Sequence, residues 1–273
     1  MPELPEVETI VRSLRCGGMT GESILNRQIL SVDCFNPNTL VYDGSAAECT
    51  RALSGARITA VECRAKYIRI TTEKPSILIH LRMSGDLRCE AENAGEFLPH
   101  DRFVFHFSDG TRLVFNDVRK FGRIWVTEDP DAVLEGLGIE PLGDEFTGEW
   151  LRQRLAGQRR MIKAVLLDQS VIAGIGNIYA DESLFDAGIL PTRPASSLTE
   201  EECQKLRDSI RKTLEHAIEQ NGSSFDWAYK GGHFQNEFRV YQRKGEPCPL
   251  CGTPIERTVI NQRGTHFCPK CQG

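Results

Sequence analysis

Apolar residues recur at helical spacing near the start of the chain, at Val7, Ile10, Val11 and Leu14. Residues at i, i+3, i+4 and i+7 lie on one face of a helix. Pro5 suits the first turn of a helix, and the Gly17-Gly18 pair ends the pattern. The spacing therefore predicts an amphipathic helix over Pro5–Cys16.

A different pattern, with apolar residues at alternate positions, dominates residues 57–126. It is clearest over Ser76–Arg82 and over Arg102–Phe107. Asp109-Gly110 then predicts a tight turn into a further strand over Arg112–Asn116. We therefore expect a β-rich N-terminal domain over residues 1–133, a sandwich with the first helix beside it.

Helical patterns return after a Gly- and Pro-containing linker at residues 134–147. They predict helices over residues 149–155, 161–167 and 177–186, and a longer one that begins at Thr199. The Thr199 hydroxyl three residues before Glu202 is typical of a capping box. A turn ending in Gly174-Ile175-Gly176 joins two of these helices, as in helix-turn-helix DNA-binding proteins. Helical domains that do not bind DNA show the same pattern. The pattern therefore fits a DNA-binding domain and a helical domain of another function.

The ten cysteines fall into two groups. Six are scattered, as expected of free thiols in a reducing compartment. The other four have the spacing C-x2-C-x16-C-x2-C, at Cys248, Cys251, Cys268 and Cys271. This spacing is typical of one structural Zn²⁺ ion held by four thiolates, which leave no open position for catalysis. The alternatives are a spacing that arose by chance or a disulfide pair.

The segment between the two cysteine pairs predicts a β-hairpin. Residues 254–260 and 265–267 read as two short strands, and the turn Asn261–Gly264 ends in glycine. Arg263 would then project from the tip of a finger stapled by the metal.

Charge and hydropathy narrow the class of protein. The first 25 residues contain several glutamates and no long apolar run, which excludes a secretory signal and favours the cytoplasm. No stretch approaches the roughly 18 apolar residues of a membrane span. The net charge is −5, but Tyr229–Gly273 holds 7 basic and 3 acidic side chains, a net +4. Such a module is compatible with phosphate contact, as it is with an ordinary solvated tail.

Short motifs along the chain resemble those of one family. They are MPELPEVET at residues 1–9, AKY at 65–67, HLRMSG at 80–85, DVRKFG at 117–122, GIGNIYADE at 174–182, ILP at 189–191, and QRGTH at 262–266. In this order they are similar to the motifs of formamidopyrimidine-DNA glycosylases, the family that includes endonuclease VIII. The resemblance covers essentially the whole chain.

The resemblance implies an α+β fold. The N-terminal β-sandwich domain with its flanking helix would span residues 1–133. A linker at 134–147 would lead to a helix-two-turn-helix DNA-binding domain at 148–224. Residues 225–273 would hold a lesion loop and the zinc β-hairpin finger.

The resemblance also implies a bifunctional DNA glycosylase and AP lyase of base-excision repair. It would flip out and excise oxidised purines (formamidopyrimidines and 8-oxoguanine) and then cleave the strand by β,δ-elimination. Pro2 matches the nucleophile, because removal of Met1 exposes a secondary amine. An α-amino pKa of about 7.7–8.0 leaves part of it neutral at pH 7. Attack at C1′ gives an iminium that acidifies the C2′ proton. The alternative is that Pro2 merely follows the start codon.

Three further side chains match the family's catalytic residues or lie beside them. Glu3 would protonate the sugar ring oxygen and shuttle protons during elimination. Lys66, expected on a strand, would bind the phosphate of the lesion and act as an acid. Glu6 would support the amine electrostatically, or it is an exposed carboxylate at a helix start.

The remaining matches concern DNA. Asn177, at the start of a helix, and Arg263, on the finger, would bind the backbone phosphates and help to kink the duplex. Met83, Arg119 and Phe121 match a triad that fills the void left by an everted base. The alternative for Met83 is an ordinary core position.

One segment departs from the family pattern. The loop at residues 225–233 is shorter than usual and carries Phe225, Trp227 and Tyr229. It leaves open a preference for oxidised pyrimidines, as in endonuclease VIII, or for another lesion. A non-catalytic DNA-binding zinc protein is a third possibility, against which Pro2, Glu3 and Lys66 together argue. We expect a monomer that binds damaged double-stranded DNA, with no membrane partner, in the cytoplasm at the nucleoid.

Overall fold

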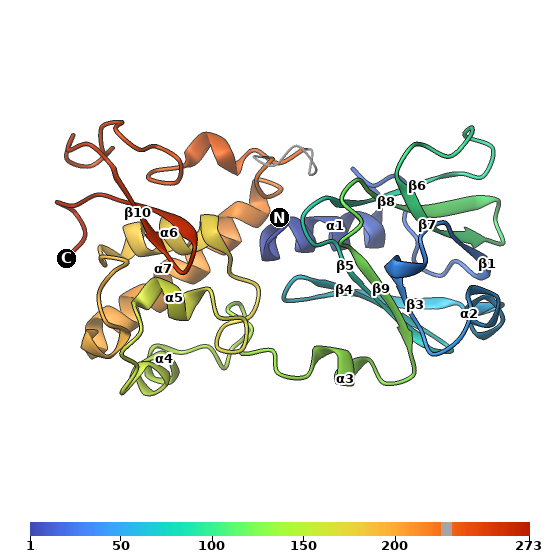
Figure 1. The fold of residues 1–273 in the computed structure, drawn as a ribbon, viewed down its shortest axis with the longest axis horizontal. Coiled ribbons are helices and arrows are strands. Elements are labelled where there is room, and N and C mark those ends of the chain that lie inside the picture. Colours follow the sequence, from blue (N-terminus) through green and yellow to red (C-terminus); the bar gives the residue numbers. More distant parts are fainter. Residues whose placement is uncertain (225–230) are drawn as a thin grey trace. The chain divides into compact units, whose positions relative to one another are not determined.

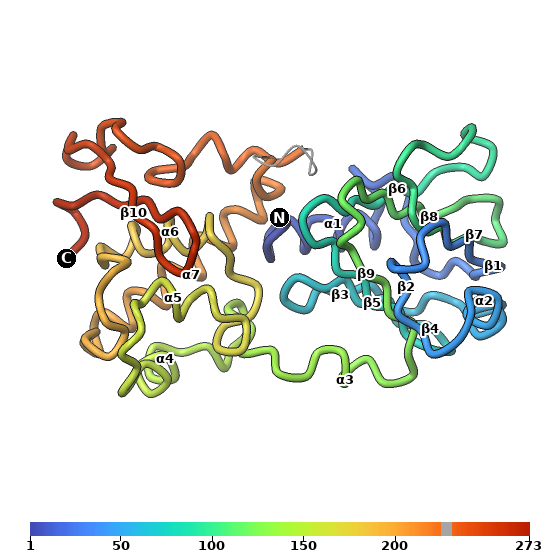
Figure 2. Tube along the Cα trace, in the orientation of Figure 1, coloured from blue at the N-terminus to red at the C-terminus, as the bar shows by residue number. Residues whose placement is uncertain are grey.

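The computed structural model describes residues 1–224 and 231–273, so Phe225, Trp227 and Tyr229 lie outside the described residues. The chain divides into two compact units. Unit 1 comprises Met1–Glu135 and the described residues of Ser223–Gly232. Unit 2 comprises Gly136–Gly222 and His233–Gly273. The two are traced along the chain in Figures 1 and 2.

Unit 1 is built on two β-sheets. The four-stranded sheet has the order β1-β7-β8-β6 and the five-stranded sheet the order β2-β9-β5-β4-β3. Neighbouring strands are antiparallel except for β2 and β9. The strands are β1 (Ile29–Cys34), β2 (Leu40–Val41), β3 (Ile58–Arg64), β4 (Tyr67–Thr72), β5 (Ser76–His80), β6 (Gly85–Ala91), β7 (Asp101–Phe107), β8 (Thr111–Asp117) and β9 (Arg123–Thr127).

One hydrophobic core joins both sheets and the first helix. Helix α1 (Leu4–Cys16) buries Val7, Ile10, Val11 and Leu14 in this core and packs on β3 and β4. The expected helix is confirmed, and Gly17, with φ 83°, follows its last residue. The C-terminal part of α1 lies beside the strands in Figure 1. Helices α2 (Ala46–Leu53) and α3 (Pro130–Leu134) and the 3-10 turn η1 (Pro37–Thr39) complete unit 1.

Unit 2 combines helices with a β-hairpin. Its elements are α4 (Gly148–Leu155), α5 (Ile162–Leu166), α6 (Asn177–Ala187), α7 (Glu200–Glu219), the 3-10 turns η2 (Ala195–Ser197) and η3 (Phe234–Glu237), and the strands β10 (Glu256–Ile260) and β11 (Arg263–Phe267). Thr199 accepts a hydrogen bond from the Glu202 N–H, so the expected capping box is confirmed. The hairpin lies against α6 (Figure 1).

Two successive turns connect α5 to α6. The Asp168 N–H bonds to the Val165 carbonyl, and the Val171 N–H bonds to the Asp168 carbonyl. The amide of Gln169 then brackets the glycine turn, because it donates to the Ile175 carbonyl and accepts from the Gly174 N–H. The expected α+β class, with a β domain, a helical domain of this type and a zinc finger, is confirmed.

The hairpin turn differs from the sequence expectation. Asn261 and Gln262, with φ 47° and 61°, form a two-residue turn, and Arg263 pairs with Ile260 as the first residue of β11. Positive φ at both central residues is the backbone of a type I′ turn, whose twist matches the strands. The prediction of a four-residue turn closed by Gly264 is therefore wrong.

No helix among the described residues is both long enough and apolar enough to cross a membrane.

Candidate active site and nucleic-acid interface

The first turn of α1 is buried and fixed in place. Pro2 is buried, and Glu3 and Glu6 are only 4% and 3% exposed. One Glu6 oxygen accepts the Glu3 N–H at 2.8 Å, and the other accepts the Ser223 N–H at 2.7 Å. Chain ends usually fray unless they are tied down. The alternative that Glu6 is an exposed carboxylate is wrong.

Lys66 lies in the two-residue turn between β3 and β4, where Ala65 has φ 56°. The expectation that it lies on a strand is wrong by one residue, because β4 begins at Tyr67. Its side chain is 5% exposed, unlike that of a solvated surface lysine.

His80, paired with Tyr67 in the register of β4 and β5, has a strongly lowered pKa. Burial, together with the positive charges of Arg82 and Lys66, lowers the pKa of His80 to about 3. The ring is therefore neutral, and its Nδ1 accepts the Arg82 N–H at 3.0 Å. This bond fixes the chain at the start of the turn that carries Met83.

Met83, Arg119 and Phe121 form one exposed cluster in unit 1. Met83 follows β5, and the other two lie between β8 and β9. An Arg119 guanidinium nitrogen lies 3.1 Å from the Met83 sulfur, and the guanidinium carbon lies 4.9 Å from the centre of the Phe121 ring. Met83 is 41% and Phe121 48% exposed. The alternative of a core position for Met83 is wrong.

Asn177 is the first residue of α6, which begins after Gly176. The Asn177 amide Nδ2 donates to the Gly264 carbonyl of the finger at 3.0 Å. Arg263, next to Gly264, is exposed, and no hydrogen bond or ion pair with another described residue engages its guanidinium. The start of α6 and the finger tip are thus held together within unit 2.

A buried ion pair that the sequence analysis did not assign supports the same junction. Lys163 and Asp181 have fully buried side chains with 2.6 Å between Nζ and Oδ1. Lys163 Nζ also donates to the Gly264 carbonyl at 3.0 Å and to the Thr265 hydroxyl at 2.9 Å. Asp181 accepts the His266 N–H at 2.9 Å. Charged residues inside otherwise apolar runs were the only sequence signal for this pair.

Glu182, beside Asp181, binds the backbone of a second segment, residues 239–241. Its fully buried carboxylate accepts the N–H groups of Arg239, Val240 and Tyr241 at 2.8–3.1 Å. Burial raises the pKa of Glu182, and these donors oppose the rise. Glu182 therefore anchors the chain that leads into the finger.

The four finger cysteines are arranged to hold one metal ion. Their sulfur atoms all lie within 4.8 Å of one another. Tetrahedral Zn²⁺ with Zn–S bonds of about 2.3 Å requires sulfurs about 3.8 Å apart. The Cys271 N–H donates to the Cys268 sulfur, and the Gln272 amide bonds both the Cys268 N–H and the Ile189 carbonyl. The second cysteine pair is thus attached to the helices of unit 2.

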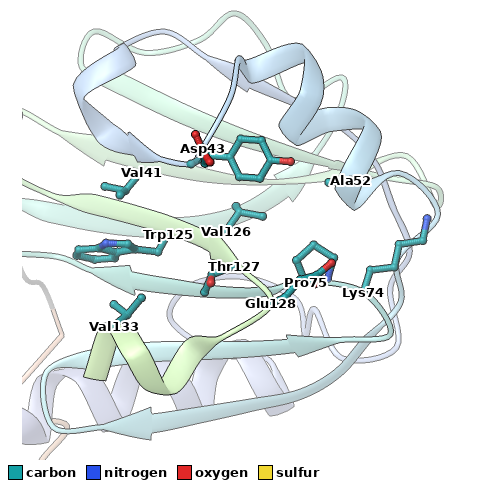
Figure 3. Close-up of a pocket in the computed structure, with 11 residues that line it drawn as sticks. Val41, Asp43, Ala52, Lys74, Pro75, Trp125, Val126, Thr127, Glu128 and Val133 are labelled. Atoms are coloured by element: carbon teal, nitrogen blue, oxygen red, sulfur yellow. The ribbon is translucent and has the colours of Figure 1, made fainter. Parts of the chain in front are cut away.

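A surface hollow in unit 1 is unrelated to these residues. It lies beside β9 and is lined by Tyr42, Lys74, Trp125 and Val133, among others (Figure 3). None of the predicted site residues lines it.

Known proteins that are similar to this chain identify its family. The chain is 42% identical over 281 residues to formamidopyrimidine-DNA glycosylase of Geobacillus kaustophilus, with all of both chains covered. It is 44% identical to formamidopyrimidine-DNA glycosylase of Chloroflexus aggregans, and the alignment covers 100% of this chain and 98% of the relative. The chain belongs to the formamidopyrimidine-DNA glycosylase family.

Family models and solved structures agree with this membership. The formamidopyrimidine-DNA glycosylase N-terminal domain matches residues 1–124, its H2TH domain residues 137–228, and the zinc finger found in FPG and IleRS residues 245–273. Lactococcus lactis Fpg in complex with FAPY-dG-containing DNA has a TM-score of 0.88 at 34% identity, with 99% of each chain covered. MutM in complex with carbocyclic 8-oxo-G-containing DNA has a TM-score of 0.89 at 35% identity, again with 99% of each chain covered.

The activity follows from the family. This formamidopyrimidine-DNA glycosylase family member is a DNA glycosylase and AP lyase of base-excision repair that acts on oxidised purines in DNA. Its finger holds one structural zinc ion.

Proposed function

We propose that Pro2, after removal of Met1, is the nucleophile of this glycosylase. The fixed first turn of α1 carries this proposal, because Pro2, Glu3 and Glu6 are all buried where chain ends usually fray. The Pro2 nitrogen attacks C1′, the damaged base leaves, and the cationic iminium acidifies the C2′ proton. Loss of that proton expels the 3′-phosphate, and a second elimination expels the 5′-phosphate.

We assign the proton transfers to Glu3 and the lesion phosphate to Lys66. Glu3 directly follows Pro2 in the chain, and both residues are buried. Glu3 protonates the ring oxygen as the sugar opens and then takes part in the eliminations. Buried Lys66 presents its ammonium to the phosphate without the competing hydration of a surface lysine. Glu6 supports the turn by holding the Glu3 backbone.

Asn177 and Arg263 form the proposed phosphate clamp. α6 begins at Asn177, and the positive end of a helix dipole favours an anion there. The Gly264 carbonyl, which bonds both Asn177 and Lys163, fixes the finger tip beside that end. Met83, Arg119 and Phe121 form the proposed wedge that fills the void left by the everted nucleotide.

Retained Met1 or the substitution Pro2→Gly tests the nucleophile. Either change should reduce the cleavage of lesion-containing duplexes to a small fraction of the wild-type rate. Pro5→Ala is the matched control, because it removes a buried proline from the same turn but leaves the amine intact. Full activity in a Met1-retaining preparation would remove Pro2 from its role.

We propose that the short aromatic loop at residues 225–233 shapes lesion choice. Phe225, Trp227 and Tyr229 offer stacking surface, and each base–aromatic stack contributes about 1–3 kcal/mol. Stacking tolerates many bases, whereas hydrogen-bonded capture discriminates. We expect good activity on ring-opened purines, lower activity on 8-oxoguanine, and some on oxidised pyrimidines. The alternative is an endonuclease VIII-like preference for oxidised pyrimidines. Values of kcat/KM on these three substrates, before and after Trp227→Ala, test this. A strong 8-oxoguanine preference that survives Trp227→Ala would contradict it.

We further propose that the protein acts as a monomer on damaged double-stranded DNA in the cytoplasm, at the nucleoid. The scattered free thiols support a reducing compartment. Light scattering at micromolar concentration tests the monomer, and a dimer mass would contradict it.

A further inference from the structure

The carboxylate of Asp117, the last residue of β8, is fully buried and serves two loops. One oxygen, Oδ1, accepts the Ser84 hydroxyl and also lies 3.2 Å from the Arg119 N–H. The other oxygen, Oδ2, accepts the Gly122 N–H at 2.8 Å. Among the described residues, only hydroxyl and backbone N–H donors reach this carboxylate.

These donors belong to the two loops that carry the proposed wedge. The first loop, residues 81–84, bears Met83, and the second, residues 118–122, bears Arg119 and Phe121. Gly85 pairs with Asp117 in the register of β6 and β8, so the loops leave the sheet side by side. The Ser84 hydroxyl also accepts the Arg119 N–H at 3.1 Å, which closes the link between them.

The packing below the loops leaves them little freedom. The ring of Phe115 is fully buried. A Cβ on Gly85 would lie 2.8 Å from this ring, and a Cβ on Gly122 would lie 2.3 Å from it. Gly85 directly follows the first loop and Gly122 ends the second, and both glycines lie against the same aromatic ring.

We propose that Asp117 is the positioning residue that holds the two intercalating loops at a fixed separation, so that the wedge is formed before DNA binds. This inference rests on the proposed role of Met83, Arg119 and Phe121. A wedge that is already ordered inserts without first losing conformational entropy, which favours base eversion.

The chemistry of the carboxylate explains why an amide cannot replace it. An ionised carboxylate only accepts hydrogen bonds, and both of its oxygens face donors here. In Asp117→Asn, one oxygen becomes an NH₂ group that faces a donor. If the amide oxygen remains at the Oδ1 position, the Gly122 N–H loses its partner and the second loop is released.

The experiment measures eversion and excision separately in the full-length zinc-loaded enzyme. A 2-aminopurine beside the lesion reports unstacking by stopped-flow fluorescence, and single-turnover assays report base excision and cleavage of a preformed abasic site. Asp117→Asn should slow eversion and excision roughly tenfold, as expected from losing a hydrogen bond to a charged group. Abasic cleavage should stay within about twofold of wild type, because there is no base to unstack.

Matched variants separate the possible causes. Asp109→Asn makes the same change two residues before β8, where the exposed Asp109 carboxylate accepts from Thr111 and pairs with Arg27, and it should behave as wild type. Ser84→Ala removes only the hydroxyl link and should slow eversion by a smaller factor. If Asp117→Asn does not fold, by circular dichroism, the Ser84→Ala result decides.

Three outcomes would overturn the inference. The first is that folded Asp117→Asn everts the base at the wild-type rate while Met83→Ala everts it slowly. The positioning role of Asp117 would then be wrong, and the wedge role of Met83 would be supported. If Met83→Ala and Phe121→Ala are both normal, the wedge itself is wrong. An equal loss of excision and abasic cleavage in Asp117→Asn would show a general structural defect instead.

Discussion

The catalytic role of Glu3 can be tested separately from that of Pro2 by a single substitution. Glu3→Gln keeps the shape of the side chain but removes its proton transfer. Base excision should fall by at least about a hundredfold, the usual contribution of a general acid, while DNA affinity is retained. Glu8→Gln is the control, because Glu8 lies on the same helix and pairs with Arg12. Normal turnover in Glu3→Gln would remove Glu3 from catalysis.

The prediction for Arg263 concerns DNA affinity and its dependence on salt, because its exposed guanidinium would bind a phosphate rather than a base. Arg263→Ala should weaken binding by a similar factor for different DNA sequences. The slope of log affinity against log salt concentration should become shallower by about one unit. Arg154→Ala, at another exposed arginine of unit 2, should leave the slope unchanged. A sequence-dependent loss in Arg263→Ala would indicate base contact instead.

At the scale of elements, the join between α7 and η3 should respond to pH. His216 Nε2 lies 2.5 Å from Glu237, and Glu219 lies 3.5 Å from the other ring nitrogen. The hydrogen bond and charge of Glu237, opposed by burial, raise the pKa of His216 above 6.5. The protonated pair therefore stabilises η3 fully below pH 6.5, and this contribution is lost as pH rises through the raised pKa. The effect is small, because both side chains are substantially exposed.

NMR titration of the His216 ring measures this directly. Glu237→Gln should return the pKa of His216 toward 6.5. The protection factors for hydrogen exchange in Phe234–Glu237, which are corrected for the intrinsic exchange rate at each pH, should then stay constant over this range. An unchanged His216 pKa in Glu237→Gln would contradict the assignment.

The elements that sequence patterns predicted best are those with a strong internal period. In α1 and α7 the apolar residues recur at helical spacing, and β5, β7 and β8 are bounded by clear turn signals. β1 and α2 were missed, because six- and eight-residue elements with mixed burial leave little periodicity to detect. Lys66 and the hairpin turn were misplaced by one or two residues, since strand ends depend on backbone twist rather than on residue type.

The buried polar contacts could not be predicted from one sequence. Lys163 and Asp181 lie 18 positions apart and meet residues of the finger about a hundred positions from Lys163. Asp117 and Ser84 are separated by 33 positions. Such pairings are set by tertiary packing, so the motifs identified which residues matter but not what holds them in place.

At the scale of the whole molecule, each unit has its own hydrophobic core, and the zinc finger belongs to the second. Cys268→Ser or chelation of zinc should therefore unfold the finger and abolish DNA binding, because metal binding and folding of such a module are linked. The core of unit 1 should remain folded, as measured by hydrogen exchange of β4, β5 and β8. Cys203→Ser, at a cysteine outside the metal site, is the control. Active protein without zinc would contradict this prediction.

Borohydride trapping tests the central claim most directly. Mature protein is incubated with lesion-containing duplex and borohydride, and the cross-linked peptide is identified by mass spectrometry. If the Pro2 amine attacks C1′, reduction of the iminium should leave the sugar covalently bound to the nitrogen of Pro2. Pro2→Gly and a Met1-retaining preparation should give little adduct. An adduct on Lys66, or a full-strength adduct while Met1 is retained, would contradict the account.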